Sequence, residues 1–251
     1  MLRLEKRPNP SKFWLYGTPV VAVVLTMIVG GTLFAFMGKN PVEVIRTIFW
    51  DPLFGEFAFY LRGQLLVKAG PLILIAIGLA LGFKAGIWNI GAEGQYIMGA
   101  ICGAAVGLAV YPTESRWIYP AMVIAGAFGG WAWAMIPAIL KTRFQTNEIL
   151  VSLMLVYVAQ TILAKASTGF LKNPEGMGFP GSRNFSSYPA AANPDLFFPG
   201  SGLHWGGVTA LVVAVVAWVL LSRHIIGFQI KLSGQAPRAA RFHGVNPSKL
   251  V

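Results

Sequence analysis

The sequence predicts an all-α, polytopic membrane protein with about six membrane-spanning helices and a cytoplasmic N-terminus. Of its 251 residues, 55% are hydrophobic and only 12% are charged, whereas soluble domains carry about 25% charged residues. Mean hydropathy is +0.62. Uncharged runs long enough to cross roughly 30 Å of hydrocarbon recur along the chain and alternate with short basic segments. We therefore expect a single transmembrane domain over residues 1–251, embedded in a lipid bilayer.

Each predicted span is a run of residues with few or no ionisable side chains. The first run is too long for a signal-peptide core and lacks a small-residue cleavage site, so we expect an uncleaved helix. Lys68 lies near one end of the second run, where its stem can carry the ammonium group to the interface. The fourth run contains Pro120 and Pro137. The six predicted spans are 13–38, 65–83, 95–111, 117–140, 149–164 and 205–221.

Basic residues predict the orientation of the chain. Four of them precede the first span, against one acidic residue, and cytoplasmic segments are typically enriched in Lys and Arg. Alternation of the spans then places Lys84, Lys141, Arg143 and the residues after 223 on the same, cytoplasmic side. We therefore interpret the net charge of +11 as an orientation signal, and we expect no nucleic-acid partner.

Two segments on the predicted outer side differ from ordinary connections. Residues 40–63 mix apolar and charged side chains, which is typical of an interfacial helix, and we expect it to break at Pro52. Residues 172–202 are rich in Pro, Gly, Asn and Ser. A long loop of this composition is more often functional than idle, so it is either a docking face or a plain connector.

The most informative stretch precedes the third span, where residues 86–100 read GIWNIGAEGQYIMGA. Ionisable and amide groups at the edge of a bilayer are costly and commonly functional, which favours a solute pathway. Gly91 and Gly94 are expected to permit a helix break or a close crossing. The candidate pathway residues, including two from a later segment, are Trp88, Asn89, Gly91, Glu93, Gly94, Gln95, Asn147 and Glu148.

Glu93 is the carboxylate of this stretch, and no second acid or histidine accompanies it there. A relay of protons needs further titratable groups, so we predict a structural or gating role. We expect the carboxylate to accept hydrogen bonds from the amides of Asn89 and Gln95. The alternative is a carboxylate that is simply hydrated at the head-group boundary.

Residue types that would indicate an enzyme or a metal site are not clustered. The three histidines are scattered, the single cysteine, Cys102, lies in an apolar run, and the sequence has no phosphate-binding Gly-Lys-Ser loop. We expect Cys102 to be inert packing. No catalytic residue, metal site or bound cofactor is therefore predicted for this chain.

Residues 227–249 follow the last span on the predicted cytoplasmic side. Pro237 suits the first turn of a short helix, the following alanines favour its interior, and Gly244 suits its C-terminal end. Such a basic helix either docks on a soluble partner or only meets anionic lipid head groups. The residues expected to form the docking segment are Gly234, Pro237, Arg238, Ala239, Ala240, Arg241, Phe242 and Gly244.

Three blocks resemble the permease subunits of ABC importers in the ribose/simple-sugar, branched-chain amino acid and nucleoside group, and the nucleoside branch most of all. They are residues 82–95 (GFKAGIWNIGAEGQ), 146–157 (TNEILVSLMLVY) and 227–244. Two positions depart from the pattern: Val156 and Ala236 each stand where an asparagine is usual. Such permeases usually continue through further spans, so we expect this chain to be C-terminally truncated.

The resemblance implies a transport subunit that forms a pathway by alternating access. In that family the block corresponding to 227–244 is a coupling helix seated on an ATP-binding subunit, which binds the ATP and Mg²⁺. The implied partners are that ATP-binding subunit, a second permease subunit and an extracytoplasmic solute-binding protein, and the implied location is the bacterial plasma (inner) membrane.

The resemblance implies a small polar solute as substrate, and nucleosides are the first choice. A nucleoside needs aromatic surfaces for its base and amide or hydroxyl partners for its ribose. Simple sugars and branched-chain amino acids are alternatives. An ion-coupled secondary transporter is a different class, but it usually needs intramembrane acids. The residues that offer aromatic or amide contacts are Trp88, Tyr96, Phe128, Trp131, Trp133, Tyr157, Asn89, Gln95, Asn147 and Gln160.

Overall fold

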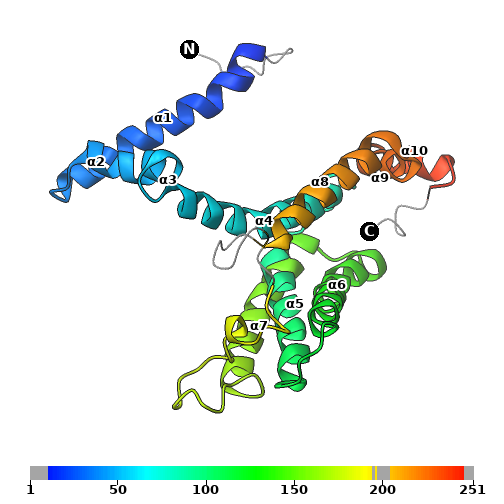
Figure 1. Ribbon diagram of the computed structural model, residues 1–251. Coiled ribbons are helices and arrows are strands. Elements are labelled where there is room, and N and C mark those ends of the chain that lie inside the picture. Colours follow the sequence, from blue (N-terminus) through cyan, green and yellow to red (C-terminus); the bar gives the residue numbers. More distant parts are fainter. Residues whose placement is uncertain (1–10, 194–195, 197–203, 246–251) are drawn as a thin grey trace. The chain divides into compact units, whose positions relative to one another are not determined.

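The computed structural model describes residues 11–193, 196 and 204–245, a part of the chain built from helices and their connections (Figure 1). The chain divides into two compact units with the boundary between Leu65 and Leu66. Each unit is described by itself.

The first unit contains α1 (Lys12–Phe36), α2 (Pro41–Ile45), a π-helical turn (Arg46–Trp50) and α3 (Asp51–Phe54). Gly38, at a φ of +75°, ends α1 and reverses the chain. The Asn40 side chain then accepts the Val42 N–H at 3.0 Å and caps α2. A Cβ on Gly31 would lie 3.3 Å from the Ile45 side chain, so α2 folds back closely on α1.

The helical segment expected over 40–63 breaks at Gly55 and not at Pro52. Pro52 lies in the first turn of α3, where its missing N–H and fixed φ suit a helix start. At Gly55 the backbone is extended, and a Cβ there would lie 2.6 Å from the Asp51 carbonyl oxygen. The next helix, α4 (Ala58–Lys84), begins directly afterwards. It starts seven residues before the predicted span at 65.

The second unit is organised around α5 (Ala92–Ala109), which packs against both α6 (Ile118–Phe144) and α7 (Glu148–Thr168). The crossing of α5 and α6 is a glycine seam formed by Gly99, Gly103, Gly126 and Gly130. A Cβ on Gly99 would lie 2.9 Å from the Gly126 carbonyl oxygen, so backbone meets backbone across the seam. Small residues allow such close approach of helices in membranes.

The remaining helices of the second unit are α8 (Trp205–Arg223), α9 (Ile225–Gln235) and α10 (Pro237–Phe242), with a short 3₁₀ turn (Phe185–Ser187) before them. A Cβ on Gly70 of α4 would lie 3.5 Å from the Gly207 Cα of α8, which places these two helices in contact. The predicted coupling segment corresponds to α9 and α10 as far as residue 245, and residues 246–249 lie outside the described residues.

Among the described residues, five helices are long and apolar enough to cross a membrane: α1, α4, α6, α7 and α8. The third predicted span, 95–111, corresponds to α5, which is a helix but is not one of the five. Its first turn carries Glu93 and Gln95, and glycines replace large apolar side chains along it. A helix enclosed by two neighbours needs less apolar surface than one facing lipid.

The loop over residues 172–202 is held by specific contacts where the structure describes it. The Tyr188 hydroxyl donates to the Thr113 carbonyl oxygen, between α5 and α6, and its ring meets Tyr111 edge-on with centroids 5.1 Å apart. The Arg183 guanidinium lies 4.2 Å from the Tyr111 ring centroid and forms a two-pronged pair with Glu175 at 3.1 Å. The described part of the loop is therefore fixed to the α5–α6 turn.

Candidate solute cleft and coupling segment

The candidate cleft consists of two adjoining cavities of about 270 and 490 Å³ lined by α4, α5 and α6, with the start of α7 and Ile230 of α9. The two cavities share Asn89 and Gln95, whose amides are the polar groups common to both. The larger cavity adds Tyr96 and Trp131. A mostly apolar hollow with a few amides and aromatic rings is typical of small-molecule sites.

Asn89 reaches the cleft because the chain leaves α4 through a Schellman motif. Gly86 has a φ of +78°, its N–H bonds the Phe83 carbonyl oxygen, and the Ile87 N–H bonds the Gly82 carbonyl oxygen at 2.9 Å. Residues 85–91, here called the connector, then lead without regular secondary structure to the start of α5. The Asn89 side chain accepts the Gly91 N–H at 2.8 Å, which shapes the last turn of the connector.

The connector is fixed to the first turns of α7. The Ser152 hydroxyl accepts the Ile90 N–H at 3.2 Å and donates to the Ile149 carbonyl oxygen at 3.1 Å. Ser152 is only 2% exposed. A Cβ on Gly91 would lie 2.7 Å from the Ser152 carbonyl oxygen, so only glycine fits against α7 here.

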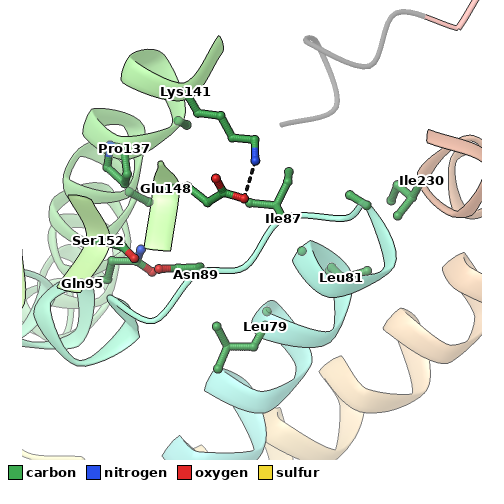
Figure 2. A pocket seen from close by; sticks show the side chains of 15 residues that line it. Leu79, Leu81, Ile87, Asn89, Gln95, Pro137, Lys141, Glu148, Ser152 and Ile230 are labelled. Carbon is green, nitrogen blue, oxygen red and sulfur yellow. Dashed lines mark hydrogen bonds and ion pairs between the residues drawn. The ribbon is translucent and has the colours of Figure 1, made fainter. Parts of the chain in front are cut away.

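An ion pair lies in the wall of the smaller cavity. Lys141, in the last turn of α6, pairs with Glu148, in the first turn of α7, and both side chains line the cavity (Figure 2). They are brought together because Gln145 takes a left-handed conformation at the end of α6 and the Asn147 side chain caps α7, accepting the Ile149 N–H at 3.0 Å. Asn147 therefore serves as a helix cap and does not line either cavity.

The prediction that Glu93 accepts hydrogen bonds from the amides of Asn89 and Gln95 is wrong. Its carboxylate instead accepts a hydrogen bond from the Gln160 amide of α7 at 3.1 Å. The helical repeat places Glu93 and Gln95 on different faces of α5, and Asn89 is engaged with the connector. The Glu93 side chain is exposed and lines neither cavity, whereas Gln95 lines both.

The candidate aromatic residues separate into two groups. Tyr96 and Trp131 line the larger cavity, and Phe128 stacks on Trp131 with centroids 5.5 Å apart. Trp88 stacks on Phe83 instead, with centroids 4.9 Å apart. Tyr157 and Trp133 line neither cavity. The Trp133 indole N–H lies 3.2 Å from where a Gly94 Cβ would be, at the crossing of α5 with α7. The buried Gly94 thus marks a close helix contact and not the cleft surface.

The coupling segment contains the short helix that the sequence predicts. Pro237 starts α10, and Gly244, at a φ of +73°, ends it. The Val245 N–H bonds the Ala240 carbonyl oxygen at 3.0 Å, as in the Schellman motif of α4. Ala240 is fully buried within this chain, whereas Phe242 is 92% exposed. The surface of α10 that is open to a partner is therefore formed by Arg238, Arg241 and Phe242.

Two cleft residues, Ser152 and Lys141, are absent from the set predicted by sequence. Ser152 lies inside the motif over 146–157, but a single serine in an apolar helix gives no signal until its partner at Ile90 is known. Lys141 appears in the sequence as an orientation charge. Its spacing of seven residues from Glu148 across a turn is the one local hint of a pair.

Comparison with known proteins identifies the family. Residues 61–251 match the model of the branched-chain amino acid transport system / permease component family. The glucose ABC transporter permease protein TsgB13 of Haloferax volcanii is 33% identical over 98% of this chain and 65% of its own length. The guanosine ABC transporter permease protein NupP of Bacillus subtilis is 27% identical, and the nucleoside ABC transporter permease protein NupB of Lactococcus lactis subsp. cremoris is 26% identical.

The alignments with NupP and NupB each cover 93% of this chain, and 65% and 64% of the relatives. The chain thus spans slightly less than two thirds of the length of these relatives. No solved structure matches it. The family model covers more than half of the chain and coincides with the helices that form the cleft and the coupling segment. The protein therefore belongs to the branched-chain amino acid transport system / permease component family.

Proposed function

We propose that this chain forms the translocation pathway of an ATP-driven importer in the plasma (inner) membrane of a bacterium and that nucleosides are its substrates. A second permease subunit completes the pathway, and two copies of an ATP-binding subunit bind ATP and Mg²⁺. An extracytoplasmic solute-binding protein delivers the solute. The chain itself carries no catalytic group in this proposal. Transport proceeds by alternating access.

The observation that carries the proposal is the composition of the cleft. Asn89 and Gln95 present amide donors and acceptors that suit ribose hydroxyls and base edges, and Tyr96 and Trp131 present aromatic faces to the larger cavity. The two charged side chains of the smaller cavity, Lys141 and Glu148, neutralise each other. The cleft thus suits an uncharged, partly aromatic, polar solute. The relatives named for guanosine and nucleosides support this choice.

A sugar is the second candidate, and the 33% identity with a glucose permease favours it. Sugars also bind through amides against an aromatic face, so the cleft alone accommodates both classes. The same cleft argues against a free amino acid, because its carboxylate and ammonium groups would meet a lysine and a glutamate that are already paired.

Energy is proposed to enter through α10. Arg238, Arg241 and Phe242 are exposed on one short helix that directly follows α9, and α9 in turn contributes Ile230 to the cleft wall. Arginine and aromatic residues are the types enriched in energetically dominant interface positions. Ala240 supports the helix from within and is not a contact for the partner.

Vesicle transport provides the test. The full chain is reconstituted with the second permease subunit, the ATP-binding subunit and the solute-binding protein encoded beside it. Uptake of labelled guanosine, glucose and leucine is then measured with ATP or with an imposed proton gradient. We expect ATP-dependent guanosine uptake, reduced about tenfold or more by Asn89→Ala, because one polar contact to substrate amounts to about 1.4 kcal/mol. Gln64→Ala removes an amide that lines neither cavity and is the matched control.

Uptake of glucose without uptake of guanosine would show that the substrate is a sugar and not a nucleoside. Uptake driven by the proton gradient in the absence of ATP would overturn the transporter class.

A further inference from the structure

The connector touches the coupling segment as well as α7. A Cβ on Gly86 would lie 3.3 Å from the Gly234 Cα. In the other direction, a Cβ on Gly234 would lie 2.2 Å from the Lys84 carbonyl oxygen and 2.9 Å from the Gly86 nitrogen. These are contacts of backbone with backbone, so neither side can yield by changing a rotamer. The end of α9 and the start of the connector are therefore in direct, side-chain-free contact.

The far end of the connector is held against Ser152 of α7. Ser152 binds the Ile90 N–H through its buried hydroxyl, and its backbone leaves no room for a side chain at Gly91. Between these two attachments lie Ile87 and Asn89, which both line the smaller cavity, as Figure 2 shows. The contact with α9 and the attachment to α7 thus lie at opposite ends of the segment that bears the cleft amide.

We propose that Gly234 and Ser152 are positioning residues that together make the connector a link between the coupling segment and the cleft. Gly234 transmits the movement of α9 to Gly86, and Ser152 anchors the opposite end so that the connector shifts Asn89 and does not detach from α7. The proposal rests on the proposed function, since it takes the movement of α9 to be driven by an ATP-binding subunit. Through Gly234 and Ser152 that movement reaches Asn89 in the cleft.

The connector's exposure to a thiol reagent tests the link without requiring the substrate. Ile87→Cys is introduced in a Cys102→Ala background, and the full complex in vesicles is labelled with N-ethylmaleimide, with no nucleotide or with ATP and vanadate. We expect the labelling rate at position 87 to change severalfold between the two states. In the added presence of Gly234→Ala, the rate should become the same in both states while ATP hydrolysis continues.

Gly30→Ala is the matched control, because a Cβ at Gly30 would meet nothing within 4 Å and it lies in α1. It should leave the nucleotide-dependent difference unchanged. If Gly234→Ala also leaves the difference unchanged, the link does not run through this contact and the proposal is wrong. The proposal is also wrong if, with wild-type Gly234, the labelling rate at position 87 is the same with and without nucleotide.

Ser152→Ala provides a second variant in case Gly234→Ala prevents assembly. It keeps the size of the side chain, leaves the Gly86–Gly234 contact intact and removes the partner of the Ile90 N–H. We expect faster labelling at position 87 in both states and a smaller difference between them. Ser222→Ala is its control, since that hydroxyl bonds the Trp218 carbonyl oxygen of its own helix. Equal behaviour of the two serine variants would refute the anchoring role of Ser152.

Failure of this inference is separable from failure of the proposed function. The unmodified complex could take up guanosine with ATP while the labelling rate at position 87 stays the same with and without nucleotide. That result would support the importer and contradict the link through the connector. A complex that neither transports nor binds the ATP-binding subunit would remove both.

Discussion

Replacing Gly91 by alanine is the most direct test of the packing between the connector and α7. The new Cβ would lie 2.7 Å from the Ser152 carbonyl oxygen and 2.8 Å from the Ser152 Cβ. Comfortable contact needs about 3.5 Å, so the two segments must separate by about 0.8 Å. A separation of that size also stretches the 3.2 Å hydrogen bond from the Ile90 N–H to the Ser152 hydroxyl beyond its useful range.

The expected loss of stability follows from these two effects. Overpacking costs about 1–3 kcal/mol, and loss of one buried hydrogen bond adds about 1 kcal/mol. A total of about 3 kcal/mol corresponds to a fall in Tm of about 6–12 °C for a chain of this length. Gly94→Ala should cost less, because the nearest atom to its new Cβ, the Val156 Cα, is 3.1 Å away.

The single cysteine supplies the assay. Cys102 lies in α5, where a Cβ on Gly129 of α6 would come within 2.6 Å of its sulfur, so reaction with a thiol-reactive dye reports separation of these helices. Purified protein is heated with the dye, and the midpoint is compared among wild type, Gly91→Ala and Gly30→Ala. The last variant adds a methyl group in open space and should melt at or above the wild-type temperature. If Gly91→Ala has the same melting temperature as the wild type, the close contact between Gly91 and Ser152 does not exist.

Three further substitutions test the coupling and polar contacts. Phe242→Ser should abolish ATP-driven uptake while the subunit still inserts in the membrane, because it removes an exposed aromatic anchor from α10; normal uptake would argue against docking there. Glu93→Gln should lower uptake only about twofold to threefold, since an amide can still pair with Gln160 and the site is exposed; complete loss of transport would require a charge-dependent step. Glu148→Gln should destabilise the chain by about 1–3 kcal/mol, because it leaves the Lys141 ammonium without its partner. Adding Lys141→Met should restore part of the lost Tm. No recovery of Tm would mean that the ion pair contributes little to stability.

The helices themselves could be read from the sequence because each depends on a local pattern. A run without charges predicts a membrane helix wherever it occurs, and Pro237 with Gly244 sufficed to delimit α10. The break at Gly55 was missed because Pro52 is the conspicuous residue, yet proline is compatible with the first turn of a helix. What ends the segment is a backbone conformation that becomes visible only in three dimensions.

The contacts within the site could be predicted only in part. Asn89, Gln95 and Glu148 were found because polar groups next to apolar runs are conspicuous, and all three line the cleft. The partners of Glu93 and of the connector were not found, because Gln160 and Ser152 lie more than sixty residues away along the chain. Local patterns contain no information about which turn of α7 faces which turn of α5.

The glycine seam limits how this protein can change by mutation. In an ordinary core, a side chain that becomes too large can be accommodated when a facing residue becomes smaller. At Gly99 the facing atom is the carbonyl oxygen of Gly126, and at Gly103 it is that of Met122. Main-chain atoms are the same in every amino acid, so no substitution on α6 creates the missing space. Searches for second-site suppressors of Gly99→Ala or Gly103→Ala should therefore yield none on the facing helix, only reversions or distant changes that raise overall stability.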